Sequence, residues 1–126
     1  LSGAYILDTN AIIYYVTAED GARAVLVPII QSYATLVVPS IVITELWSGK
    51  DTPASETRTI EEFLATVLIL PLDADLAKSA GKIRRDRNLG IGDSIIAATV
   101  LLMGATLLTR NIRDFKRVQN LQLEAI

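Results

Sequence analysis

The sequence contains no cysteine and no histidine. Without cysteine there is no disulfide, no thiolate nucleophile and no cysteine-ligated zinc. Without histidine the chain lacks the most common general base and the most common zinc ligand. Any catalysis by this chain must therefore use carboxylates, hydroxyls, amides, lysine, arginine or a bound cofactor.

Long apolar runs are also absent. The longest, such as residues 94–103, fall well short of the roughly 20 residues that cross a bilayer, and the first residues lack the basic-then-apolar order of a signal peptide. A chain of 126 residues, 51% of them apolar, has the size of one domain and enough apolar side chains for a core. We expect a single domain over residues 1–126, in a soluble, cytoplasmic protein with no membrane partner.

Positive charge is limited as well. The net charge is −2 and the isoelectric point is near 5.0, which argues against a surface that is basic throughout and coats nucleic acid. The cations nevertheless gather in two groups, at residues 82–87 and 110–117. Each group is either an ordinary solvated face or a local edge that binds phosphate.

Short apolar segments alternate with helical ones along the chain. Such alternation is typical of a parallel sheet covered by helices on both faces, so we predict a three-layer α/β fold with about five parallel strands. The strands are expected at 4–8, 35–39, 66–72, 105–110 and 121–126. The helices are expected at 11–18 with a cap at Thr9 or Asn10, at 20–34 with a kink or break at Pro28, at 40–50 with a cap at Ser40 and a stop at Gly49, at 55–67 after a loop at 51–55, at 73–90, and at 92–104, the last buried all round, with a turn or short helix at 111–118.

Four acidic residues stand out against this pattern. Asp8 ends the first predicted strand, Asp93 begins the buried helix, and Asp114 follows the fourth strand. Each of these three alone is explained as a helix cap or a loop residue. Glu45 is harder to explain, because it lies within an otherwise nearly apolar segment, and a buried carboxylate without a partner costs several kcal/mol. It needs either an exit to water or a partner.

The predicted topology brings several of these acids together. The functional crevice of an open α/β sheet lies outside the carboxyl ends of its strands. Two carboxylates ~4 Å apart repel each other by up to about 4 kcal/mol at an effective dielectric constant of ~20, and a divalent cation turns that repulsion into coordination. Oxygen ligands without histidine or cysteine favour Mg²⁺ or Mn²⁺ over zinc. Such a site suits phosphodiester hydrolysis, and the two basic groups would then hold a polyanionic backbone.

Three stretches of the sequence resemble the PIN domain, in particular the toxin ribonucleases of VapBC-type toxin–antitoxin pairs. They are YILDTN, VVPSIVITELWSG and AGKIRRDRNLGIGDSIIAATVLLMGATLLTRNIRDF, and with a terminal strand they extend over essentially the whole chain. The resemblance implies a central parallel sheet between helices, an acidic pocket that binds Mg²⁺ or Mn²⁺, and metal-dependent endonuclease activity on RNA.

The resemblance also assigns roles to individual residues. Asp8, Glu45 and Asp93 match the three principal acidic positions and are assigned metal binding and water activation. Many relatives have a fourth acid where this sequence has Asn111, and we predict that Asp114 supplies that acid, directly or through a water. Supporting roles are expected for Thr9, Asn10, Thr109 and Asn111. Asn10 alternatively only caps the first helix.

The predicted partners are RNA, a cognate antitoxin and a second copy of the chain. RNA contacts are expected from Arg84, Arg85, Arg110 and Arg113, with a surface salt bridge as the alternative for Arg110. The resemblance implies that the antitoxin inserts a segment at the acidic groove. Trp47, Tyr14 and Tyr15 belong either to that surface or to the core.

Three other functions compete with this one. A phosphorylation-receiver domain needs adjacent acids after the first strand and an acceptor Asp near mid-chain, but the loop after the second strand carries Ser40 and no Asp. A haloacid-dehalogenase-like phosphatase needs Asp-x-Asp, and the third position here is Asn10. The remaining alternative is a catalytically silent PIN-fold binding module, favoured only by Asn111 and opposed by the three intact acids.

Overall fold

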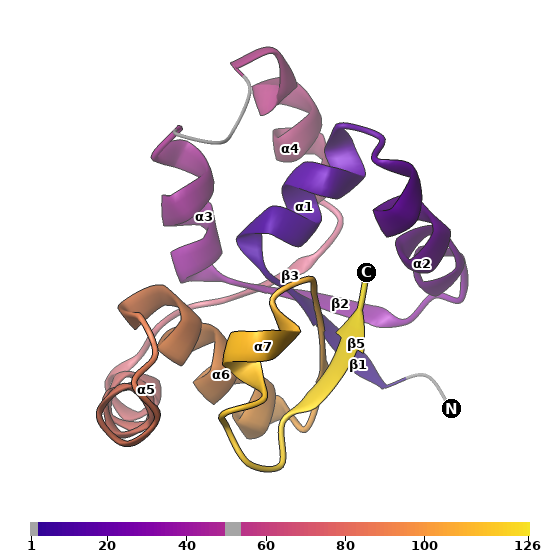
Figure 1. The fold of residues 1–126 in the computed structure, drawn as a ribbon. Coiled ribbons are helices and arrows are strands. Elements are labelled where there is room, and N and C mark those ends of the chain that lie inside the picture. Colours follow the sequence, from indigo (N-terminus) through magenta and orange to yellow (C-terminus); the bar gives the residue numbers. More distant parts are fainter. Residues whose placement is uncertain (1–2, 50–53) are drawn as a thin grey trace.

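The computed structural model describes residues 3–49 and 54–126, and its centre is a parallel sheet of five strands in the order β3-β2-β1-β4-β5 (Figure 1). All four neighbouring pairs run parallel. The strands are β1 (Ala4–Leu7), β2 (Thr35–Pro39), β3 (Leu68–Leu70), β4 (Thr106–Thr109) and β5 (Gln122–Ala125). The predicted fold class is confirmed.

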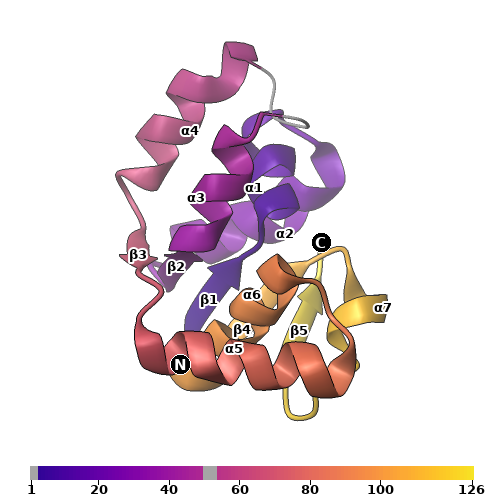
Figure 2. The ribbon, with the colours of Figure 1, turned by 90° about the vertical axis from the view of Figure 1, so that its left-hand side faces the viewer.

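Seven α-helices within the described residues cover the sheet. They are α1 (Thr9–Val16), α2 (Asp20–Gln31), α3 (Ser40–Trp47), α4 (Thr57–Leu64), α5 (Ala74–Arg87), α6 (Ile91–Met103) and α7 (Ile112–Phe115), with a 3₁₀ turn η1 (Ala54–Glu56) before α4. Helices α1–α4 lie on one side of the strands and α5–α7 on the other (Figures 1 and 2).

The core lies between these layers. Strand residues that are buried on both faces read as continuous apolar runs, because helices exclude water from each side. Ile6, Leu7, Val37, Leu107 and Leu108 are all fully buried.

The strand order reverses direction at β1, since the chain moves from β1 to β2 on one side and reaches β4 on the other. In such sheets this is the place where ligands bind.

Two predicted helix caps are wrong. Asp8, not Thr9 or Asn10, caps α1: its backbone is extended and its side chain accepts a hydrogen bond from the Ala11 amide. Pro39, not Ser40, occupies the cap position of α3, with no side-chain cap. At α1 several neighbouring residues were suited to the cap, whereas at α3 the strand β2 runs through Pro39 and the helix begins directly at Ser40.

Other helices also differ from the prediction, either in where they end or in burial; α1, α3 and α4 each end two or three residues earlier than predicted. Helix α2 ends at Gln31 with Pro28 inside it, and α5 ends at Arg87, three residues early, because Asn88 takes the left-handed conformation with φ of 55°. Helix α6 is buried only over residues 94–100, since Leu102 at its end is 67% exposed. The predicted loop at 51–55 lies largely outside the described residues, whereas Gly49, with φ of 77°, follows the end of α3 as expected.

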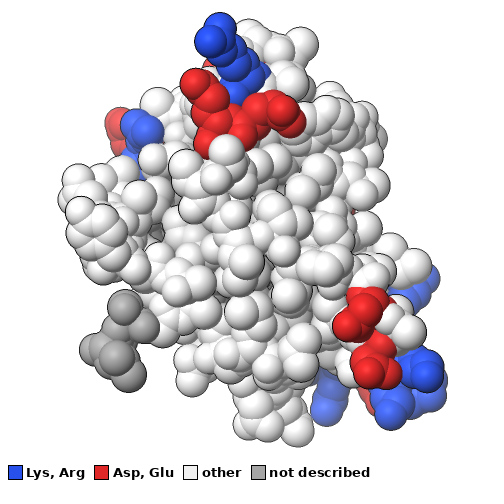
Figure 3. Space-filling model, turned by 180° about the vertical axis from the view of Figure 1, so that it is seen from behind, with Lys and Arg blue, Asp and Glu red and all other residues white. Residues whose placement is uncertain are grey.

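Charge is unevenly distributed over the surface. Seen from behind, acidic and basic side chains gather near α4 and near α5, and most of the described surface between them is uncharged (Figure 3). That part of the surface therefore offers few cations to a polyanion.

None of the described helices is both long enough and apolar enough to cross a membrane.

Candidate active site

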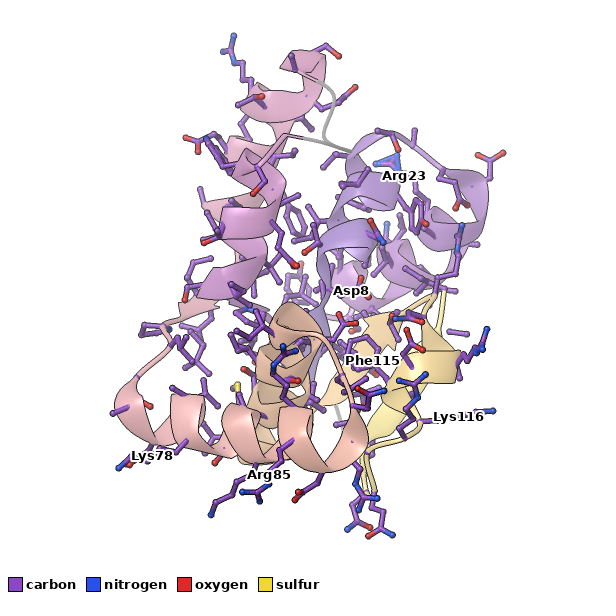
Figure 4. All side chains as sticks on the ribbon, turned by 60° about the vertical axis from the view of Figure 1, so that its left-hand side comes forward. Asp8, Arg23, Lys78, Arg85, Phe115 and Lys116 are labelled. Carbon is purple, nitrogen blue, oxygen red and sulfur yellow. The ribbon has the colours of Figure 1, made fainter. Side chains whose placement is uncertain are left out.

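Asp8 lies at the carboxyl end of β1, deep in the structure. Its side chain is 7% exposed and lies where the two helical layers meet (Figure 4). The pairing of Leu7 with Leu108 sets β1 and β4 in register, so Thr109 follows directly beside Asp8. The Thr109 hydroxyl donates to Asp8 Oδ2 at 2.5 Å, and the Ala11 amide donates to Oδ1 at 2.8 Å. Burial raises the pKa of Asp8, while these two hydrogen bonds oppose that rise.

Glu45 comes from α3 and reaches the same edge of the sheet. Its Oε1 accepts a hydrogen bond from the Thr9 hydroxyl at 2.5 Å. Its carboxylate also lies against Gly92 of α6, where an added Cβ would stand only 2.6 Å from Glu45 Oε2. Glu45 is exposed, so it has both an exit to water and a protein partner. Together these contacts place the Glu45 carboxylate between the starts of α1 and α6.

Asp93, the third residue of α6, is half-buried beside the other acids. The pKa of Asp93 is raised to about 6, first by burial and then by the negative charges of Glu45, Asp8 and Asp114. The four predicted acids therefore share one electrostatic environment. Repulsion between these acids disfavours ionisation of all four, and a bound cation would reduce that repulsion.

Asp114 lies in α7, at the other side of this group. Its Oδ2 accepts a hydrogen bond from the Asn111 side-chain amide at 3.1 Å, and its Oδ1 pairs with Arg117 at 3.1 Å. The Asn111 backbone amide donates to the Thr109 hydroxyl oxygen at 2.9 Å. A chain of hydrogen bonds thus runs from Asp8 through Thr109 and Asn111 to Asp114. Asn111 therefore links Thr109 to Asp114 by hydrogen bonds, and its supporting role in the site stays a prediction.

The sequence matches the family model of the PIN domain over residues 5–121. The chain belongs to the PIN domain family. It is 30% identical to the ribonuclease VapC2 of Haemophilus influenzae, over 95% of this chain and 96% of that protein. It is 28% identical to the ribonuclease VapC2 of Rickettsia felis, again over 95% and 96%. Within the family it is of the VapC type.

A solved structure supports the same assignment. The structure of VapBC2 from Rickettsia felis, bound to a DNA fragment from its promoter, superposes with a TM-score of 0.80 at 28% identity and covers 98% of each chain. The five-stranded order and the helices on both sides are therefore those of a VapC-type PIN domain.

The carboxylates of this PIN domain fit a hard divalent cation by their chemistry. The chain has no histidine or cysteine, so the acids offer only oxygen ligands. Over residues 3–49 and 54–126, however, no three acidic side chains are close enough to surround an ion as they stand. Both oxygens of Asp8 and of Asp114 and one oxygen of Glu45 accept from protein groups in this arrangement.

Three of the four arginines predicted to bind RNA make hydrogen bonds or ion pairs with other groups of this chain. Arg110 pairs with Glu19, lies 4.1 Å from the centre of the Tyr14 ring, and donates to the Ile126 carbonyl at 2.9 Å. The salt bridge considered as its alternative is therefore present.

Arg84 donates to the Leu89 carbonyl at 3.0 Å, and Arg85 pairs with Asp86 on the outer side of α5 (Figure 4). Arg113 is exposed and makes no side-chain hydrogen bond or ion pair with the part of the chain that is described. Among the described residues it is therefore the predicted RNA contact that has no partner of this kind.

Two contacts at the site were not predicted from the sequence. Gly92 provides the space that lets Glu45 approach α6, and Arg117 pairs with Asp114. The contact between Arg117 and Asp114 was predictable in principle, because Arg117 stands three residues after Asp114, a spacing at which side chains meet on a helical turn. The contact between Gly92 and Glu45 depends on tertiary packing between α3 and α6, for which the sequence offers no local sign.

Replacing Thr109 by Val tests how Asp8 is held. Val has nearly the same shape but lacks the hydroxyl, so Asp8 Oδ2 loses its donor and the Asn111 amide its acceptor. We expect the free energy of unfolding to fall by about 1–3 kcal/mol, measured by urea denaturation. Thr106→Val is the matched control, because its hydroxyl, on the same strand, makes only an exposed 3.3 Å hydrogen bond to Gln122. Equal effects of the two substitutions would show that the Thr109–Asp8 bond contributes nothing special.

Proposed function

We propose that this PIN domain is a metal-dependent endoribonuclease, the toxin of a VapBC-type pair. The observation that carries the proposal is Asp93, half-buried at a helix start and surrounded by the charges of three other acids. The relatives are named ribonucleases, which supports RNA as the substrate. The structural relative is a VapBC complex, which supports an antitoxin as partner.

The acids would hold one or more Mg²⁺ or Mn²⁺ ions. Asp8, Glu45 and Asp93 are the proposed ligands, and Asp114 contributes directly or through a water. Such an ion, when bound, lowers the pKa of water and neutralises charge on the phosphoryl group. The chain's own groups arrange this: the Thr109 hydroxyl fixes the Asp8 carboxylate, and the Thr9 hydroxyl fixes that of Glu45.

The reaction we propose is hydrolysis. The oxygen of a water attacks the phosphorus, a phosphorus–oxygen bond forms, and the bond to the leaving ribose oxygen breaks, with that oxygen taking up a proton from solvent water. A carboxylate of the site accepts the proton of the attacking water. Arg113 is the proposed phosphate contact, because it is exposed next to Asp114 and free of partners within the described residues. It would hold the RNA backbone beside the acids.

Exposed apolar side chains support the two proposed protein partners. Trp47 is 48% exposed and, with Ile60, lines a hollow of about 210 Å³ between α3 and α4, which suits an antitoxin segment. Tyr14 and Tyr15 contact Arg110 and Phe63 instead, so they contribute to packing. Ile91, at the start of α6, is 64% exposed and lines an almost wholly apolar hollow against α5, which suits a second copy of the chain.

The test is cleavage of a mixed RNA pool by the purified protein with Mg²⁺, with Mn²⁺ and with chelator. We expect cleavage with either metal, none with chelator, and recovery when metal is restored. Cleavage that persists in chelator would contradict metal dependence. No cleavage under any condition, together with no Mn²⁺ binding, would favour the silent binding module.

A further inference from the structure

Arg117 bridges two segments that carry acids of the site. It follows α7 by two residues, and its Nη2 pairs with Asp114 Oδ1 at 3.1 Å. Its Nη1 donates to the backbone carbonyl of Asn88 at 3.2 Å. Asn88 ends α5, twenty-nine residues earlier in the chain. A single guanidinium thus ties the α7 acid to the turn between α5 and α6.

That turn determines where Asp93 lies. Asn88 is left-handed, Gly90 caps α6, and Asp93 follows three residues later. Arg84, from α5, donates to the carbonyl of Leu89 at 3.0 Å. Two successive carbonyls, of residues 88 and 89, are therefore each held by an arginine, one from α5 and one from the segment after α7. The start of α6 is fixed from two directions.

The ion pair between Arg117 and Asp114 contributes little to stability, which argues for a different role. The side chains of Arg117 and Asp114 are 42% and 36% exposed, and ion pairs this exposed contribute at most about 1 kcal/mol to folding. Asp114 also faces the negative charge of Asp93, which favours rotation of its carboxylate away from that residue. A planar guanidinium that is also hydrogen-bonded to the Asn88 carbonyl opposes that rotation.

We propose that Arg117 is a positioning residue: it holds Asp114 beside the other acids and fixes the turn that carries Asp93 into the site. Arg117 itself contacts neither RNA nor metal in this role. The inference rests on the proposed function, since the geometry it preserves is that of the metal ligands. It adds that the group of four acids requires a positively charged side chain, Arg117, beside it.

The sign of one measurement separates this role from a simple charge effect. A cation near a metal site repels the metal, so removing it should tighten Mn²⁺ binding if charge alone mattered. If Arg117 positions the acids, Arg117→Gln should instead weaken Mn²⁺ binding by about tenfold. The free Mn²⁺ signal in electron paramagnetic resonance gives the affinity. Lys116→Gln is the matched control, because it removes the same charge at the neighbouring position. The Lys116 side chain is exposed and makes no ion pair within the described residues.

A conservative variant and a second readout complete the test. Arg117→Lys keeps the charge but reaches only one partner, so its affinity should lie between those of the parent and Arg117→Gln; it also replaces the glutamine variant should that one fail to fold. Amide hydrogen exchange over residues 89–93 should be faster in Arg117→Gln than in Lys116→Gln, with or without metal. Mn²⁺ binding in Arg117→Gln as tight as, or tighter than, in the parent would overturn the inference while the proposed function stands.

The two proposals fail in different ways. If the parent itself binds no Mn²⁺, the proposed metal-dependent function fails, and with it the claim that Arg117 serves the metal site. The hydrogen exchange comparison then reports whether Arg117 still orders the turn. If the parent binds Mn²⁺ and exchange over residues 89–93 is unchanged in Arg117→Gln, the positioning role is wrong and only the charge pair remains.

Discussion

Replacement of Asp93 by Asn is expected to reduce RNA cleavage by about 1,000-fold or more while the protein remains folded. Asn keeps the size of the side chain but removes the charge that would bind the metal and accept a proton. Asp93 begins no strand and caps no helix, since Gly90 holds the cap position of α6. Its loss should therefore affect chemistry and leave the fold unchanged. Cleavage of the mixed RNA pool, normalised to protein concentration, measures the effect.

Stability should change in the opposite direction to activity. The pKa of Asp93 is raised from 3.8 to about 6 in the folded protein, so the ionised form is disfavoured by folding at pH 7. Removing the charge should stabilise the metal-free protein by about 1 kcal/mol after allowance for solvent screening, or about 3–6 °C in melting temperature. Asp75→Asn, which removes an exposed acid on α5, is the matched control and should change neither property. An unfolded Asp93→Asn variant would show that the carboxylate is structural.

Mn²⁺ affinity is expected to fall about tenfold between pH 7 and pH 5. Below pH 6 a proton competes with the metal for Asp93, whose pKa is raised to about 6 by burial and by the charges of Glu45, Asp8 and Asp114. Isothermal titration with Mn²⁺ at several pH values measures the change. An affinity that stays constant over this range would show that no group with a raised pKa binds the metal.

The metal-free protein should show the reverse pH dependence. A carboxyl group whose folded pKa lies above its unfolded value of 3.8 binds more protons when folded, so stability rises as pH falls from about 6 toward 4. The melting temperature without metal should therefore be higher at pH 5 than at pH 7. Asp93→Asn should flatten this rise in part only, because the pKa of Asp8 is raised as well. A melting temperature that falls from pH 7 to pH 5 would contradict the assignment.

The sheet was predictable because its strands are short apolar segments between polar ones. Runs such as residues 35–39 become strands that helices bury on both faces, and their ends fall within a few residues of the prediction. Helix caps were less predictable, because Asp8, Thr9 and Asn10 all have side chains suited to a cap. The position at which β1 stops pairing with its neighbours made Asp8 the cap, and pairing is a tertiary property.

The grouping of the acids followed from topology, but their contacts did not. Parallel strands bring Asp8 to one edge of the sheet, and the sequence placed Asp93 at a helix start. The hydrogen bond from Thr109 to Asp8 joins residues 101 positions apart, and the bond from Thr9 to Glu45 joins residues 36 apart. Such contacts depend on how strands and helices pack. Metal binding by these acids stays a prediction, as does each of their catalytic roles.

Crystals soaked in Mn²⁺ and examined by anomalous diffraction test the central claim most directly. The account predicts an anomalous peak bound by Asp93 together with Asp8 or Glu45. It also predicts that the same soak of Asp93→Asn crystals gives a weaker peak or none. A parent crystal with no peak among these acids, or with Mn²⁺ bound only elsewhere on the surface, would contradict the claim that the four carboxylates form a metal site.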